Sequence, residues 1–240
     1  MSSPSTRRPR PPRASAAGTA TPTVTPSQTA TVTAPVGYPT CQAGEVRASF
    51  GSVASGDDGF VRLQGTRYPL SAPGDTVNSD LDRVVMHRTL LPASGYYGYV
   101  GLLRWDTSVL PDNATVTAAW LRAFINGADD TDGLSLTAGW YPWASSAGST
   151  VNDWTGTPES SALAGVSVAT IVPQVFTNMN FELGNVGQVS VTGVTSLRLH
   201  ISQRAGDAAP TGKNDVQLQA TTADSGSVQI PTLIVCYTIR

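Results

Sequence analysis

The stretch SLRLHIS, residues 196–202, decides the fold class. Its aliphatic residues at positions 197, 199 and 201 alternate with polar residues at positions 196, 198, 200 and 202. A period of two is typical of a half-buried β-strand, because successive side chains of a strand point to opposite faces of a sheet. We therefore expect a strand here, with Leu197, Leu199 and Ile201 inside and His200 facing solvent.

The same alternation recurs along most of the chain. It is clear in residues 120–125, 216–221 and 233–237, and further candidate strands are 46–54, 58–64, 83–90, 97–106, 134–141, 163–171 and 174–183. Turn-forming clusters separate them: Asp57-Asp58-Gly59, Ala72-Pro73-Gly74-Asp75, Pro111-Asp112-Asn113, Asn126-Gly127, Asp132-Gly133 and Gly184-Asn185. About eleven short strands, with no amphipathic helix of about 12 residues or more, predict an all-β protein. The specific expectation is an antiparallel β-sandwich of the jelly-roll kind.

Residues 1–40 have a different composition. They contain eight Pro and nine Thr, with hardly any large apolar residue. Such a segment cannot bury enough apolar surface to offset the entropy lost on ordering, and frequent Pro favours an extended spacer. We therefore divide the chain into a flexible arm or linker, 1–40, and a single β-sandwich domain, 41–240.

The two parts also differ in charge. The arm carries four Arg (Arg7, Arg8, Arg10 and Arg13) and no acid, whereas residues 41–240 carry eleven basic and seventeen acidic residues. An acidic body argues against nucleic-acid binding, which needs a basic face. Without an apolar run of about 18 residues, no membrane span is expected. The basic stretch from Arg7 to Arg13 has no apolar segment behind it, so we expect no cleaved secretory signal.

The two cysteines lie at the ends of the predicted domain. Cys41 is its first residue, and Cys236 is in its last predicted strand. A disulfide between them would close a very long loop and constrain the unfolded chain. The alternative is two unpaired thiols, because sequence does not place the two Cβ atoms within bonding reach.

Sequence motifs for catalysis are missing. There are only two His and no Gly-x-Ser-x-Gly, phosphate loop or His-x-x-Glu-type metal helix. A glycosidase needs only two carboxyl groups, but the three Glu residues (Glu45, Glu159 and Glu182) fall in predicted loops, strand ends or an outward strand position. The protein is therefore not expected to be an enzyme or to need a catalytic cofactor.

Aspartates cluster in predicted turns, most densely at Asp129, Asp130 and Asp132. Loop carboxylates are the hard oxygen ligands that Ca²⁺ prefers, so these three are the candidate ligands of a structural calcium ion. Asp also favours turns by hydrogen-bonding its own backbone, and that interpretation stays open.

Aromatic residues are the candidate ligand-binding groups. Trp140 and Trp143 flank Tyr141-Pro142 at the end of a strand, and Tyr96 and Tyr97 open another. Sugar rings stack their apolar faces on exposed aromatic rings. The alternative is packing, the usual role of aromatic residues in a sandwich.

Three stretches resemble the bacterial DNRLRE family, a jelly-roll module related to carbohydrate-binding modules. They are Gly101-Leu102-Leu103-Arg104-Trp105-Asp106 with the following Leu110-Pro111 and Ala114–Arg122, the mid-domain Asp153-Trp154-Thr155, and the closing Pro231–Thr238. The resemblance implies a jelly-roll fold, an extracellular or virion-surface setting and contact with glycans. It implies no catalytic residue.

Two functions are compatible with these features. The first is a non-catalytic virion structural protein, such as a capsid decoration or tail-associated protein of a bacteriophage, whose arm contacts neighbouring subunits. The second is a secreted bacterial carbohydrate-binding or adhesive module. In the first case we expect a homo-oligomer or a multicopy assembly, since weak contacts gain from repetition.

Overall fold

The computed structural model describes residues 37–52, 57–70, 76–78, 83–143, 151–154, 156–202, 208–219 and 229–240. The chain divides into two units, Met1–Thr31 and Val32–Arg240. The predicted arm lies outside the described residues, apart from its last four, 37–40. The fold below is that of the second unit.

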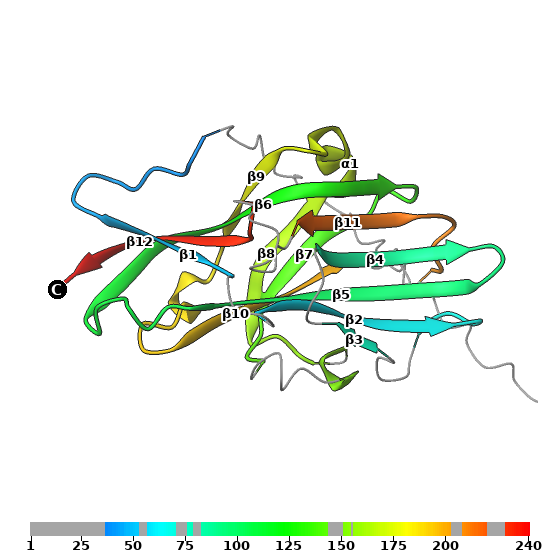
Figure 1. Ribbon diagram of the computed structural model, residues 1–240, viewed down its shortest axis with the longest axis horizontal. Helices are drawn as coiled ribbons and strands as arrows, with labels where there is room; N and C mark the ends of the chain where they lie inside the picture. The colour runs from blue at the N-terminus through cyan, green and yellow to red at the C-terminus, as the bar shows by residue number, and fades with distance from the viewer. Residues whose placement is uncertain are drawn as a thin grey trace, which may run out of the picture. The chain divides into compact units, whose positions relative to one another are not determined.

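The regular structure of the described part of this unit is almost entirely β-strand (Figure 1), which confirms the predicted all-β class. Its longest helix has four residues. None of the described helices is long and apolar enough to cross a membrane. The strands are β1 Val46–Gly51, β2 Asp58–Gly65, β3 Thr76–Asn78, β4 Arg83–Leu91, β5 Gly95–Asp106, β6 Ala114–Asp130, β7 Ser135–Trp140, β8 Ser160–Ser167, β9 Asn178–Leu183, β10 Val194–Ile201, β11 Asn214–Gln219 and β12 Thr232–Ile239. The helices are η1 Val151–Trp154, α1 Val168–Ile171, η2 Val172–Gln174 and η3 Val186–Gln188.

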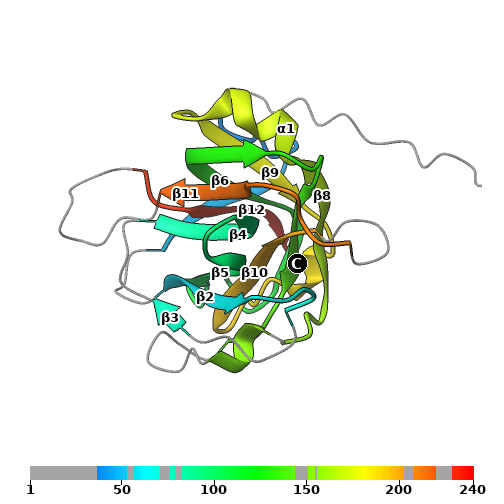
Figure 2. The same ribbon diagram turned by 90° about the vertical axis from the view of Figure 1, so that its right-hand side faces the viewer.

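The described strands join in one curled antiparallel sheet (Figure 2), with β2, β3 and β9 attached to a path in the order β1-β12-β6-β11-β4-β5-β10-β7-β8. Two long strands produce the curl. Along one edge, β6 pairs first with β12 and then with β11, while β9 occupies its other edge. In the same way β5 pairs first with β4 and then with β10, opposite β2. Each long strand thus passes from one part of the sheet to another.

One large apolar cluster lies inside the curl. Leu197, Leu199 and Ile201 of the opening stretch are at most 1% exposed, so the predicted inward positions are confirmed. Burying an aliphatic side chain of this size contributes roughly 1.5–3 kcal/mol. Alternate residues of β5 point to opposite faces, so Leu103 joins this core while Leu102 joins a smaller cluster on the other face. That smaller cluster also contains Val61, Val100 and Trp143.

The turn predicted at Asn126-Gly127 is wrong. Strand β6 continues through both residues, and its register with β11 shifts between Gln217 and Leu218. Gly127 lies opposite Gln217, and Ile125 lies opposite Leu218, which leaves Asn126 as the extra residue of a β-bulge. Turn-forming residues suit a bulge because it also departs from regular strand geometry.

His200 lies on the outer face of its strand, as predicted, but it is less exposed than expected. Its imidazole is half-buried, and Nε2 lies 3.0 Å from the Thr137 hydroxyl oxygen. Burial, assisted by the positive charges of Arg198 and Arg88, lowers the pKa of His200 to about 4. His87 is similar: burial and then Lys213 lower its pKa to about 4.

The lowered pKa values of these two histidines predict that the folded protein is less stable at acidic pH. Their folded-state pKa values lie below the ordinary value of 6.5, so between pH 6.5 and 4 the unfolded chain binds more protons than the folded one. The free energy of unfolding therefore has its full value above pH 6.5. It decreases as the pH falls towards 4, by on the order of 3 kcal/mol per histidine. Urea denaturation at pH 7, 6, 5 and 4.5 measures this slope.

A His87→Gln/His200→Gln variant is the matched control, and it should show a clearly flatter slope. Asp215 has the opposite effect on the slope of stability against pH, because burial raises the pKa of its carboxyl group. An unchanged slope in the double variant would contradict the assignment to the histidines.

Candidate functional site

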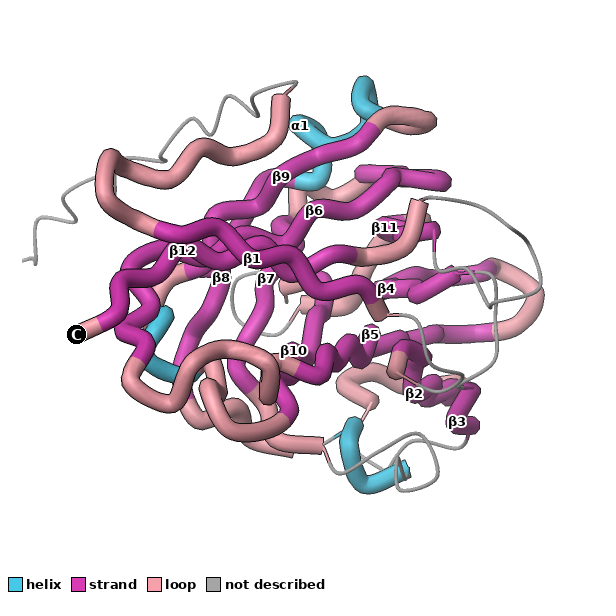
Figure 3. Tube along the Cα trace, turned by 60° about the vertical axis from the view of Figure 1, so that its left-hand side comes forward, coloured by secondary structure: helices cyan, strands magenta, loops and turns pink. Residues whose placement is uncertain are grey.

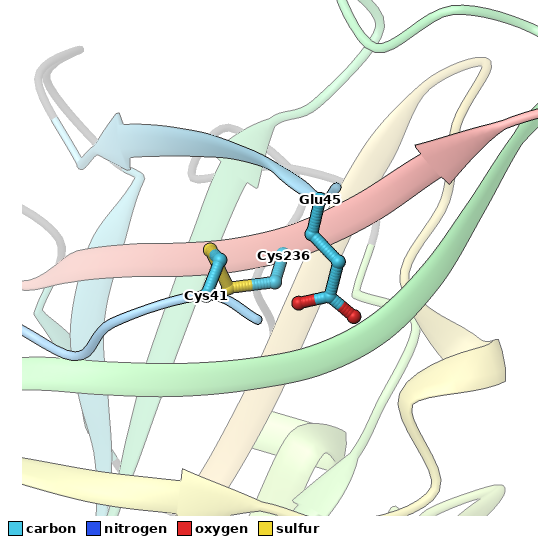
Figure 4. A group of neighbouring side chains, drawn as sticks. All are labelled: Cys41, Glu45 and Cys236. Carbon is cyan, nitrogen blue, oxygen red and sulfur yellow. A yellow bond between two sulfur atoms is a disulfide. The ribbon is translucent and has the colours of Figure 1, made fainter. Parts of the chain in front are cut away.

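The disulfide between Cys41 and Cys236, called the clasp below, joins the start of the domain to its last strand. Cys41 and Cys236 form a disulfide with a Cα–Cα distance of 5.5 Å (Figure 4). Glu45 lies beside the two sulfurs, and within the described ranges no other group of three His, Cys, Asp or Glu side chains gathers as metal ligands would. The oxidised sulfurs are not thiolates, and the Glu45 carboxylate accepts a hydrogen bond of 2.8 Å from the Gln42 amide. This corner is therefore a disulfide with a stabilised turn.

Residues 37–41, here called the strap, pass over the outer surface of the sheet before the clasp. The Asn180 side chain of β9 donates a 2.6 Å hydrogen bond to the Gly37 carbonyl oxygen. The Tyr38 ring lies 4.1 Å from the guanidinium carbon of Arg122 on β6. The guanidinium carbon of Arg47 on β1 also lies 5.7 Å from the Tyr38 ring centroid, and Cys41 bonds to β12, so the strap contacts four different strands. Figure 3 shows the chain running beside β9 before it turns back into β1.

The three predicted calcium ligands engage protein groups instead. Asp129 pairs with Lys213. Asp130 accepts hydrogen bonds from the Gly133 and Leu134 amides at 2.9 and 3.0 Å. Asp132 accepts from the Thr211 amide at 2.9 Å and from the Asn214 side chain at 2.7 Å. The carboxylates face separate partners and shape the turn after β6, which favours the turn interpretation of this cluster.

We therefore expect that Ca²⁺ does not stabilise the protein through these residues. Thermal unfolding with Ca²⁺ or with EDTA should give the same Tm, because a ligand that binds only the folded state would raise it. A Tm that rises with Ca²⁺ and loses this response in Asp130→Asn would contradict the expectation.

The ligand role predicted for Trp140 and Trp143 does not fit their burial, since a stacking ring needs an exposed face. They are 2% and 4% exposed. The Trp140 indole donates to the Gly184 carbonyl at 2.9 Å, and that of Trp143 donates to the Leu103 carbonyl at 3.1 Å. Both are packing residues. Their edges contribute to a cleft of about 510 Å³ whose accessible side includes Tyr141, Pro142 and Glu159.

Tyr96 and Tyr97 are partly exposed at the other end of β5. Tyr96 lies with its ring centroid 5.5 Å from that of Tyr68. Tyr97 is six residues from Leu103 along β5, which corresponds to about 20 Å. The Trp143 indole is hydrogen-bonded to the Leu103 carbonyl oxygen and is therefore far from Tyr97. The four aromatic residues therefore do not form one surface.

A second cleft of about 510 Å³, which the motif analysis missed, is more distinctive. It is called the arginine cleft below and is lined by Leu70, Arg88, Val100, Trp154, Arg198, His200 and Ser202. Arg198, His200 and Ser202 are polar positions of the opening stretch SLRLHIS. That polar face was the signal available in the sequence, but its partners Arg88 and Trp154 come from distant segments.

The geometry around the histidines offers no nucleophile paired with a base in the part of the chain that the structure describes. His87 Nδ1 lies 3.9 Å from an oxygen of the buried Asp215, but its Nε2 has no hydrogen-bond partner. His200 hydrogen-bonds Thr137, and Thr137 in turn lies within hydrogen-bond distance of the His200 carbonyl oxygen. Neither arrangement resembles a catalytic triad, in which the base contacts the nucleophile and is oriented by an acid.

The fold and these clefts define an all-β protein with a disulfide-closed, curled antiparallel sheet. No model of a known protein family matches the chain, and no curated protein is significantly similar to it.

Proposed function

We propose that this protein is a non-catalytic structural protein of a virion surface, such as a capsid decoration or tail-associated protein of a bacteriophage. In this proposal the arm docks onto neighbouring subunits and the β-domain is displayed outward, in many copies. The domain carries no catalytic cofactor.

The observation that carries the proposal is the way in which the arm joins the domain. The strap contacts β9 and β6 and is bonded covalently to β12. Strand β12 pairs with β1 on one side and β6 on the other, so it is interior to the sheet. A pull on the arm would therefore act on an interior strand through a covalent bond, which suits a domain that is held by its N-terminal segment. Disulfides also persist mainly outside reducing compartments.

The proposal includes a finer fold, a jelly-roll sandwich of the kind that the DNRLRE resemblance implies. Its support is that β5 and β6 each pair with two different strands along one edge, as strands that pass between the two sheets of a sandwich would. Side chains of β5, β6 and their partner strands meet in one large core. Trp105, from the motif that carries the resemblance, is fully buried there, and its indole donates to the Pro231 carbonyl at 3.0 Å.

Gradient sedimentation of particles tests the function. The full chain should sediment with purified virions, and antibodies against it should label intact particles. A variant with Arg7, Arg8, Arg10 and Arg13 replaced by Gln should bind less to particles stripped of the protein, while Arg83→Gln on the domain surface should bind normally. A protein that stays in the soluble fraction and never labels particles would refute the proposal.

The alternative function, a secreted carbohydrate-binding or adhesive module, is favoured by one observation, the arginine cleft. In that case the same antibodies would label cells or secreted material rather than virions.

A further inference from the structure

Two arginines, Arg88 and Arg198, bring positive charge to the described lining of the arginine cleft. Among the described residues, neither Arg88 nor Arg198 forms an ion pair, and no carboxylate belongs to the cleft lining. Burial lowers the pKa of Arg198, the charges of the nearby Tyr141 and Asp153 act against this shift, and the charge of Arg88 adds to it. The nearby Asp153 carboxylate accepts a 2.7 Å hydrogen bond from the Tyr141 hydroxyl and lies outside the lining. An anion in the cleft would offset the burial of Arg198 and the repulsion between the two guanidinium groups.

Neutral groups hold both guanidinium groups in place. Arg88 donates from Nε to the Ile201 carbonyl at 3.2 Å and from Nη1 to the Tyr68 hydroxyl at 2.6 Å. Arg198 donates from Nε to the Asp153 carbonyl at 3.1 Å and from Nη2 to the Trp154 carbonyl at 2.5 Å. The contacts fix both groups without neutralising them, and they leave Nη2 of Arg88 and Nη1 of Arg198 as donors. Prearranged guanidinium donors are well suited to a carboxylate.

An aromatic wall adjoins these donors. Trp154 is partly exposed and lies directly against β5 at Gly98, where a Cβ atom would overlap the indole ring. Leu70 and Val100 extend the apolar side of the lining. An aromatic face beside polar groups is the combination that binds a sugar ring, whose C–H face packs on the indole.

His200 adds a hydrogen-bond acceptor. The Thr137 hydroxyl donates to the His200 carbonyl oxygen at 3.1 Å, so its oxygen accepts the proton of Nε2 at 3.0 Å. Nδ1 is then an unprotonated acceptor, and it is buried without a partner. Because Nδ1 is inaccessible to solvent, a water enclosed beside the bound ligand would supply the missing donor.

We propose that the arginine cleft binds an acidic sugar residue, a hexuronate of a surface polysaccharide, with its carboxylate between Arg88 and Arg198 and its ring against Trp154. The inference rests on the proposed function in one respect, since display at a surface is what brings the cleft to such a polymer. It adds a recognition role to what is otherwise a structural protein.

Isothermal titration calorimetry of the full chain tests this inference with four hexuronate tetramers: galacturonate, glucuronate-containing hyaluronan, mannuronate and guluronate. At least one should bind, its methyl ester should bind at least tenfold more weakly, and added salt should weaken binding. Arg88→Gln and Arg198→Gln should each lower the affinity at least tenfold. Arg83→Gln, a matched change on the exposed start of β4, should leave it unchanged.

Thermal unfolding checks that each variant is folded, and Arg88→Lys and Trp154→Phe provide milder changes that should weaken binding by smaller factors. Absence of binding to all four tetramers, equal binding of acid and ester, or full binding by Arg88→Gln would overturn the inference. Tighter binding of inorganic phosphate or a polyol phosphate would assign the cleft to phosphate and overturn the hexuronate. Particle sedimentation is scored separately, so a virion-bound protein without hexuronate affinity fails this inference alone.

Discussion

Replacing both cysteines with alanine (Cys41→Ala/Cys236→Ala) lowers the free energy of unfolding by about 5 kcal/mol in the loop-entropy description of disulfides. The reason is the sequence separation of 195 residues, which makes the closed loop almost as long as the domain. Opening it gives the unfolded chain a large gain in conformational freedom. For a domain of about 200 residues the corresponding decrease in Tm is about 10–20 °C. Urea denaturation of both proteins under non-reducing conditions measures the difference.

Dithiothreitol provides the control for the clasp. It should shift the denaturation midpoint of the wild-type protein towards that of the double variant and leave the variant itself unchanged. A wild-type midpoint that stays constant after both thiols have been shown to be reduced would disprove a stabilising role for the disulfide.

Trp140→Ala should cost about 3–5 kcal/mol of unfolding free energy, the usual range for truncating a buried Trp. Its ring is 2% exposed within the main core, and the substitution also leaves the Gly184 carbonyl without the indole donor. Trp140→Phe should be less damaging, because it keeps most of the volume and loses only the hydrogen bond and part of the ring. Urea denaturation gives both values.

Phe176→Ala is the matched control, since it removes an aromatic ring that is 71% exposed. Its effect should stay within about 1 kcal/mol. The two interpretations of Trp140 predict opposite patterns: a ligand platform would lose binding with little loss of stability, whereas a packing residue loses stability. Near-wild-type stability of Trp140→Ala would return Trp140 to the candidate ligand residues.

The strand pattern was predictable to a large extent. All eleven predicted strands correspond to strands of the structure, and among the strands in the described ranges the three-residue β3 was the one missed. The ends were less accurate: the segment predicted as a strand over 163–171 is β8 followed by α1, and β9 starts at Asn178 rather than at 174. Val168 and Ile171 are buried on that helical turn, so their apolar character does not distinguish it from a strand.

The candidate sites were less predictable, because their chemistry depends on distant partners. Asp132 looks like a calcium ligand in the sequence, but Thr211 and Asn214 occupy its oxygens. Trp143 looks exposed beside a polar loop, but it packs with Val61 and Leu102 from two other strands.

The sequence by itself determined that this is a β-protein, which side chains of most strands point inward, and where the two cysteines stand. These properties follow from a period of two and from local turn preferences, which act between residues close in the chain. Tertiary structure alone decided that β4, β10 and η1 bring Arg88, Arg198 and Trp154 to one cleft, and that Cys41 meets Cys236. Strand pairing joins segments more than a hundred residues apart, and alternation is the same whichever strands become neighbours.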